Sequence, residues 1–167
     1  MTSDTIVPIV LIAATTAAAI VDLGTRRVPN ALTASMAAVG IGLAAASRGR
    51  VGLAASLAGS LLGLALMLPG HVLGATGAGD VKLLAAAGAF LGPAATVRAF
   101  IATAVAGGVI AVVVAVRRRR ALQTIGTTVG LIAGRSARSD VEDERAGNRF
   151  AYAPAIAIGV AVVAIGW

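Results

Sequence analysis

The sequence predicts an all-α, polytopic membrane protein, a helical bundle of about six transmembrane helices with both termini outside. Three observations predict this class. The chain is 58% hydrophobic and has a mean hydropathy of +0.93, far from the composition of soluble domains. Apolar runs long enough to cross a bilayer recur along the sequence, without the alternation of a transmembrane barrel. Arginines cluster beside these runs, as is typical of the segments that flank membrane helices. Residues 1–167 are expected to form one domain.

The first apolar segment is expected over residues 6–21. The polar residues 1–5 before it carry no Lys or Arg, which argues against a cleaved signal peptide. The pair Arg26 and Arg27 follows the segment and is expected to hold this end in the cytoplasm. Asp22 is then expected near the cytoplasmic surface of the membrane.

The second and third segments are expected over residues 31–47 and 51–68. Pro29 and Asn30 end the loop before the second segment, and a tight outer turn with Arg48 and Arg50 follows it. Pro69-Gly70-His71 is expected to break the third helix, with a loop continuing to Gly79.

The fourth segment begins at Val81 and is short, because Gly92 and Pro93 punctuate it. Either it runs on toward Arg98 or it is a shorter half-helix. The fifth segment is expected over residues 99–116 and ends in Arg117-Arg118-Arg119-Arg120. Residues 117–149 are expected to form a cytoplasmic loop, and residues 150–167 a sixth segment with Trp167 as an outer aromatic anchor.

The distribution of positive charge supports this topology. Eleven of the fourteen Lys and Arg residues fall on the cytoplasmic side, whereas Arg48, Arg50 and Arg98 fall outside. The net charge of +7 therefore indicates orientation in a cytoplasmic (inner) membrane, and no nucleic-acid partner is expected. The same topology brings Asp22 and Asp80 to the cytoplasmic side.

Composition also excludes several kinds of site. The chain has no cysteine, which excludes thiolate catalysis, disulfides and Cys-based zinc sites. A single histidine, His71, excludes a multi-histidine metal site. No metal and no cofactor are expected.

The stretch Gly77-Ala78-Gly79-Asp80-Val81-Lys82 is the centre of the functional prediction. A carboxylate at the edge of an apolar segment is costly unless it has a partner or a function. If Asp80 and Asp22 meet, the pair can share a proton, so that one carboxylate activates water while the other protonates the substrate. Gly77 and Gly79 are expected to allow backbone conformations closed to other residues and close approach of a substrate strand.

Simpler interpretations stay open for each residue. Asp80 could be the N-cap of its helix, and Asp22 could pair with Arg26 one helical turn on. Lys82 could be an interfacial lysine with its ammonium group in water. The alternative function is that of a small non-proteolytic transporter, which would use the carboxylates for protons or cations.

Together, the motifs resemble those of the type IV prepilin peptidases over residues 6–165. Asp22 followed by Arg26-Arg27-Val28-Pro29-Asn30 resembles the first aspartate motif of this family. Gly77–Leu83 resembles its second motif, GxGD followed by Lys-Leu, and Gly88–Gly92 also fits. Tyr152-Ala153-Pro154-Ala155 is similar to the motif of the last helix, although Phe150-Ala151 stands where a proline often precedes the aromatic residue.

The resemblance implies a membrane-embedded aspartic endopeptidase that works at the cytoplasmic face. Asp22 and Asp80 would be the catalytic pair, with supporting roles for Arg27, Pro29, Asn30, Gly77, Gly79 and Lys82. The partners implied are the lipid bilayer and a prepilin or pseudopilin substrate with a basic leader and a membrane helix. The chain resembles the short form of the family, without the cysteine-containing N-terminal region. Such forms occur with Flp-type pili, and cleavage without N-methylation is expected.

Overall fold

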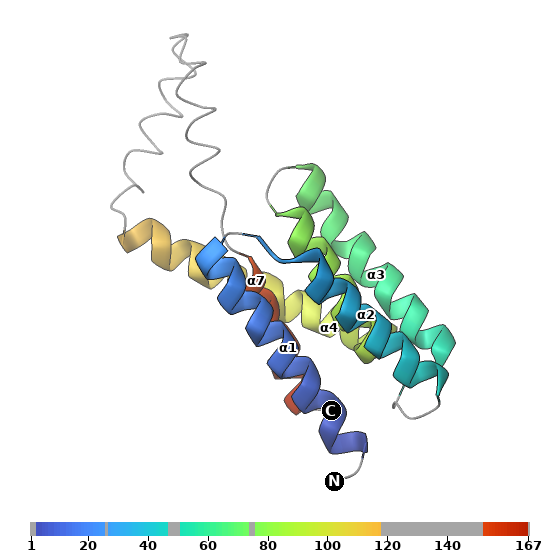
Figure 1. Ribbon diagram of the computed structural model, residues 1–167. Coiled ribbons are helices and arrows are strands. Elements are labelled where there is room, and N and C mark those ends of the chain that lie inside the picture. The colour runs from blue at the N-terminus through green and yellow to red at the C-terminus, as the bar shows by residue number, and fades with distance from the viewer. Residues whose placement is uncertain (1–2, 26, 47–50, 74–75, 118–151, 167) are drawn as a thin grey trace.

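The computed structural model describes residues 3–25, 27–46, 51–73, 76–117 and 152–166, and these are helical apart from short connections. The helices are α1 (Ser3–Thr25), α2 (Asn30–Ala45), α3 (Leu53–Val72), α4 (Ala78–Arg117) and α7 (Ala153–Ile165). They pack into one bundle, shown in Figure 1, and no strand occurs within these ranges. The predicted all-α class is therefore confirmed.

Several of the helices are suited to a membrane. Within the described ranges, three stretches are long and apolar enough to cross it: Val7–Thr25, Leu53–Val72 and Ala78–Val114. The helices α2 and α7 are apolar but shorter. The number of six crossings and the outside position of both termini stay predictions.

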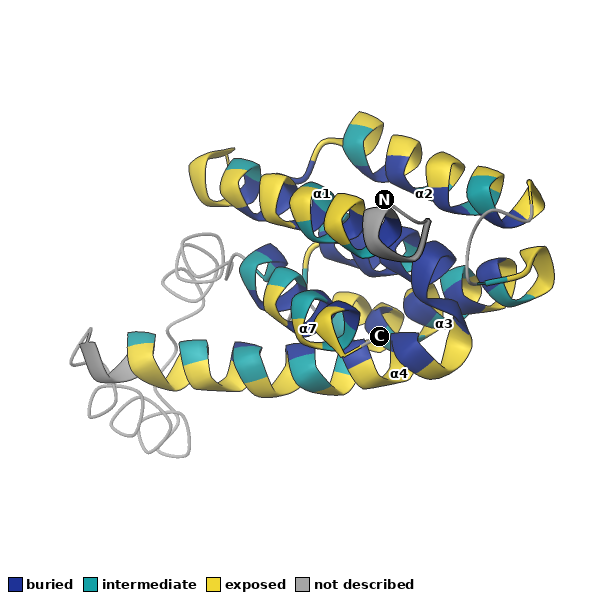
Figure 2. Cartoon of the chain, turned by 90° about the horizontal axis from the view of Figure 1, so that it is seen from below, coloured by how far each residue is buried: buried dark blue, intermediate teal, exposed yellow. Residues whose placement is uncertain are grey.

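The helix α3 has two different faces, as expected for a helix that lies between lipid and the rest of a bundle. Its outward stripe consists of exposed leucines: Leu57, Leu61, Leu64 and Leu68. Its inward stripe consists mostly of small residues: Ser56, Gly59, Gly63 and Met67. Figure 2 shows the same division along the bundle, with buried ribbon turned inward and exposed ribbon outward. Small residues line the contact because they let membrane helices approach closely.

The first part of α4, residues 78–91, runs antiparallel to α3 in close backbone contact. A Cβ atom added to Gly59 would lie 2.8 Å from Gly92 Cα, and one added to Gly63 would lie 2.7 Å from the carbonyl oxygen of Leu84. These distances leave no room for a side chain. Glycine at these positions is therefore required by the helix contact.

Two serines on α3 add hydrogen bonds to this contact. Ser56 Oγ donates to the carbonyl oxygen of Ala89 and Ser60 Oγ to that of Ala85, each at 2.7 Å. Hydroxyl-to-backbone bonds between helices are a recognised source of association in lipid, where the hydrophobic effect does not drive helices together. The helix that begins beside Asp80 is thus held firmly against α3.

Gly92 divides α4 into two parts. Its φ of 69° and ψ of 174° are not helical, and Pro93 directly follows it. An L-residue with a side chain rarely adopts this φ, so glycine is needed here. The hydroxyl of Thr96 donates to the Gly92 carbonyl at 2.7 Å and supports the restart of the helix. The two alternatives for residues 92–98 are thereby resolved: a 14-residue first part ends at the kink, and a second part runs on from Pro93.

The second part of α4, residues 93–117, packs against α7. A Cβ atom on Gly159 would lie 2.6 Å from the carbonyl oxygen of Ala99, and one on Gly107 would lie 2.7 Å from the Tyr152 hydroxyl. The helix α1 in turn packs mainly against α7 and has much less contact with α2 or α4. The bundle thus consists of an α2–α3 group, which includes the first part of α4, and an α1–α7 group, which includes the second part.

Several predicted boundaries were wrong. The fifth segment, expected from residue 99, begins at Pro93 directly after the kink. The helix α3 does not break at Pro69-Gly70-His71 but continues to Val72. Proline has a φ that suits a helix and loses only one hydrogen bond, and the Leu73 N–H still donates to the Pro69 carbonyl at 3.0 Å. The helix α1 extends past Val21 to Thr25, so Asp22 lies within it. The helix α4 begins at Ala78, before Gly79.

Some predictions concern residues outside the described ranges. They are the roles of Arg26, Arg48, Arg50 and Trp167, and the cytoplasmic loop over residues 117–149 apart from Arg117.

Candidate active site

Asp22 lies in the last turn of α1 and is buried, with 5% of its surface exposed. The backbone amide of Ala153, in the first turn of α7, lies beside its carboxylate. The N-terminal end of a helix carries partial positive charge, which favours a carboxylate at this place. The Oδ2 atom of Asp22 is enclosed, yet it has no hydrogen-bond partner among the described residues. Such an oxygen is unusual in a folded protein and has its acceptor capacity free for another molecule.

Asp80 lies in the first turn of α4 and is equally buried, also with 5% of its surface exposed. Its Oδ2 atom accepts a hydrogen bond of 2.9 Å from the backbone N–H of Gly77. The alternative that Asp80 is the N-cap is wrong, because the helix begins two residues earlier. Its carboxylate instead reaches back to the residue before the helix, as the acidic member of a capping box does. This bond fixes the orientation of one carboxylate oxygen.

The structure brings the two aspartates together at one end of the bundle. Asp22 lies close enough to Asp80 for the two charges to interact, although 58 positions separate the residues in sequence. They come from different parts of the bundle, Asp22 from the α1–α7 group and Asp80 from the α2–α3 group. The two carboxylates are thus near enough for each to affect the charge of the other.

Val28, in the connection between α1 and α2, lies against the first turn of α4. Val28 is buried, and a Cβ atom on Gly79 would lie 3.0 Å from Val28 Cβ. Lys82 Nζ donates a hydrogen bond of 2.9 Å to Asn30 Oδ1. The two motifs recognised in the sequence are therefore in direct contact. Lys82 is exposed, as expected for an interfacial lysine, but its ammonium group also has this specific partner.

The expected reason for the motif glycines needs correction. Neither Gly77 nor Gly79 has a positive φ; Gly92 is the one described glycine that does. Close approach to neighbouring atoms explains them better. A Cβ on Gly77 would lie 3.1 Å from Asp80 Oδ2, and one on Gly79 would press on Val28. Their small size thus preserves the capping bond and the contact between the two motifs.

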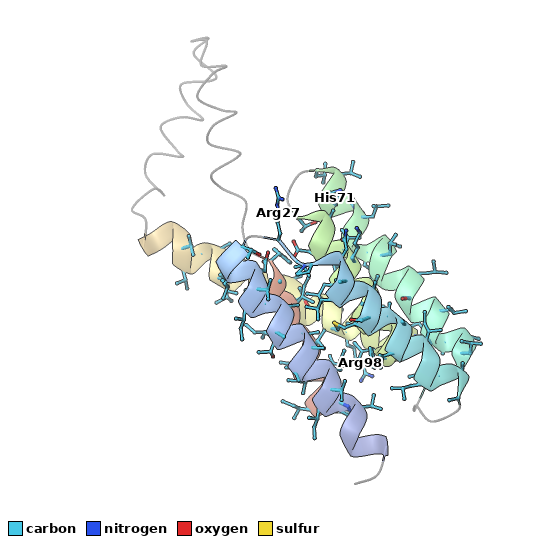
Figure 3. All side chains as sticks on the ribbon, in the orientation of Figure 1. Arg27, His71 and Arg98 are labelled. Atoms are coloured by element: carbon cyan, nitrogen blue, oxygen red, sulfur yellow. The ribbon has the colours of Figure 1, made fainter. Side chains whose placement is uncertain are left out.

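Arg27 and Pro29 shape the connection rather than the carboxylate pair. Pro29 has an extended backbone (φ −61°, ψ 132°) at the N-cap of α2, and its carbonyl accepts from the N–H groups of Leu32 and Thr33. Arg27 is exposed, and its carbonyl accepts from the Thr25 hydroxyl at 3.0 Å. Figure 3 shows Arg27 and His71 at the same end of the bundle, with Arg98 toward the opposite end.

The sequence did not predict two hydrogen bonds that join the end of α3 to Thr76, the residue before Gly77. His71 was expected in a loop but lies in the last turn of α3. Its Nδ1 lies 3.1 Å from the carbonyl oxygen of Thr76, and because a carbonyl only accepts, Nδ1 is the donor in this bond. The N–H of Thr76 donates back to the Gly70 carbonyl at 3.2 Å. Ala153 was also missed as a neighbour of Asp22, since a backbone amide leaves no signal in sequence.

The arrangement is suited to acid–base chemistry on water. Two carboxylates that share a confined site can divide the roles of base and acid, and they need neither a metal nor a nucleophilic side chain for this. Burial strengthens the interactions of such groups with a bound substrate.

Comparison with known proteins identifies a family. The model of the type IV leader peptidase family matches residues 9–112, more than half of the chain. This range contains Asp22, Asp80 and the two segments in contact around them, whereas α7 lies beyond it. No curated protein and no solved structure matches the chain significantly.

Proposed function

Because the chain belongs to the type IV leader peptidase family, we propose that it is an aspartic endopeptidase that removes the leader from prepilins. Asp22 and Asp80 would be its catalytic residues. One observation supports this assignment above the others: two buried carboxylates from separate helices are near enough for their charges to interact, and one oxygen of Asp22 has no partner among the described residues.

The proposed reaction is hydrolysis of one peptide bond. A water molecule lies between the carboxylates and loses a proton to one of them as its oxygen attacks the scissile carbonyl carbon. The other carboxylate donates a proton to the carbonyl oxygen, giving a neutral tetrahedral diol. Collapse of the diol breaks the C–N bond, the leaving amine takes a proton, and the pair returns to its starting state. The capping bond from Gly77 to Asp80 would keep one carboxylate in place through these steps.

The proposed substrate is a Flp-like prepilin with a basic leader and a membrane helix. The apolar bundle surface favours a substrate that approaches within the bilayer. The charge distribution of the sequence favours cleavage at the cytoplasmic face of the inner membrane. The hydrophobic helix of the prepilin would dock laterally and present the leader junction to the two carboxylates.

Co-expression with candidate prepilins from the same genome tests the proposal. Leader removal is followed by gel shift, and the new N-terminus is identified by mass spectrometry. Asp22→Asn and Asp80→Asn should each abolish cleavage, while membrane insertion remains normal. Asp4→Asn, at the opposite end of α1, is the matched control and should cleave normally. Full activity of either active-site variant would refute the catalytic assignment.

A further inference from the structure

Asp22 and Asp80 belong to two groups of helices that have little direct contact through α1. The helix α1 packs mainly against α7, and its contact with α4 is slight. Along the chain, the two groups are joined at the Gly92 kink of α4 and by the connection between α1, which ends at Thr25, and α2, which begins at Asn30. This connection is the one nearer in sequence to Asp22. The spacing of the carboxylates therefore depends on the packing of α7 against α4 and, close to the aspartates in sequence, on how this connection is held against α4.

Two contacts hold it there, and both involve the residues around Asp80. Val28 packs on Gly79, one residue before Asp80, and Asn30 accepts the hydrogen bond of Lys82, two residues after it. The first contact is non-directional, because it is van der Waals packing. The second has a defined donor and acceptor at 2.9 Å, and it ties Asn30, at the start of α2, to Lys82 near the start of α4.

We propose that Lys82 and Asn30 form a positioning pair for the peptidase reaction, whose hydrogen bond sets the spacing between the Asp22 and Asp80 carboxylates. This inference rests on the proposed function. Neither side chain touches the reacting atoms; both act through the backbone segments that carry the aspartates.

The chemistry of the pair suits this role. A hydrogen bond with a charged donor is shorter and stronger than one between neutral groups. An amide acceptor holds the ammonium group without placing a third carboxylate beside the two that must share protons. The long lysine stem spans from α4 to the start of α2 while its ammonium group stays at the exposed edge of the site.

A double-mutant cycle tests the pair. Lys82→Met removes the donor at similar length, and Asn30→Leu removes the acceptor at similar size. Each should lower kcat on the order of 10- to 100-fold with little change in KM, since a misplacement of about 1 Å can cost this much. The double variant should be no worse than the weaker single variant, because both changes break the same bond. Lys82→Arg keeps a donor of similar reach and should retain most of the activity.

The matched control is Arg98→Met, which removes an exposed cation toward the other end of the bundle and should leave kcat unchanged. A second measurement does not depend on activity. The chain has no cysteine, so spin labels can be attached at Gly24→Cys in α1 and Ala78→Cys in α4. Both sites are exposed, and the label-to-label distance distribution should broaden in Lys82→Met and in Asn30→Leu.

The outcomes separate the possibilities. Losses that multiply in the double variant, an unchanged kcat, or a loss that lies wholly in KM would each overturn the positioning role. An unchanged distance distribution would also overturn it. If the wild-type chain cleaves no prepilin, the proposed function fails, but the spin-label distances still decide whether the pair holds the two segments together.

Discussion

The contact between Gly79 and Val28 leads to a sharp prediction for Gly79→Ala. The new methyl carbon would lie 3.0 Å from Val28 Cβ and 3.3 Å from its Cγ2. Carbon atoms in contact normally lie about 3.5–4.0 Å apart, so the connection must move away by roughly 0.5–1 Å. Because a shift of about 1 Å at a catalytic site can cost roughly 10²-fold in rate, kcat for leader cleavage should fall about 10- to 100-fold.

The assay is cleavage of a purified prepilin in detergent or lipid, with kcat and KM measured separately. The reciprocal variant Val28→Gly supplies the internal comparison, because it removes the atoms that the new methyl would meet. Gly79→Ala should reduce kcat much less in the Val28→Gly background than in the wild type. Gly24→Ala is the control: it adds a methyl two residues from Asp22 where nothing lies within 4 Å, and it should remain active.

Two results would refute this reasoning. If Gly79→Ala retains wild-type kcat, close packing between the motifs does not set the geometry of the site. If the loss is the same in both backgrounds, the glycine is needed for a reason other than its contact with Val28.

The remaining predictions concern stability and metal dependence. Gly59→Ala should lower the free energy of unfolding by about 1–3 kcal/mol, because the new methyl overpacks the contact between α3 and α4. Gly108→Ala meets nothing within 4 Å and should be neutral or stabilising by up to about 1 kcal/mol; equal Tm changes in detergent for the two variants would contradict the packing argument. Cleavage should be unaffected by a metal chelator, since an aspartate pair needs no metal; inhibition that added metal reverses would argue against that mechanism.

The helical class could be predicted because lipid leaves the backbone few alternatives. Every buried N–H and C=O group must be satisfied within the segment, so long apolar runs become helices. The placement of Asp22 and Asp80 at one end also followed from sequence, since the arginine distribution puts the ends of their segments on the same side. The rule that proline ends a helix gave the wrong result at Pro69, because an apolar helix tolerates the loss of one hydrogen bond near its end.

The contacts that assemble the site could not be predicted in the same way. The bond between Lys82 and Asn30 joins residues 52 positions apart, and each residue alone is compatible with a simpler role. The Gly79 contact depends on which side chain of the connection faces α4. The amide of Ala153 beside Asp22 depends on how α7 packs, and every residue supplies such an amide. These features follow from the tertiary arrangement and not from a local pattern.

The kink at Gly92 gives the site a mechanical property. The first part of α4 meets the second part at Gly92 and carries Asp80 near its far tip. Because α3 packs closely on this part, the two helices would turn about the kink together, as one lever arm. Fourteen residues at about 1.5 Å each make the arm roughly 20 Å long, and a turn of only about 3° at the pivot moves the tip by about 1 Å. A change of this size, far from the carboxylates and without breaking any helix, would be enough to engage or disengage the pair. The Lys82–Asn30 bond lies near the same tip, where a single hydrogen bond has the greatest torque against such rotation.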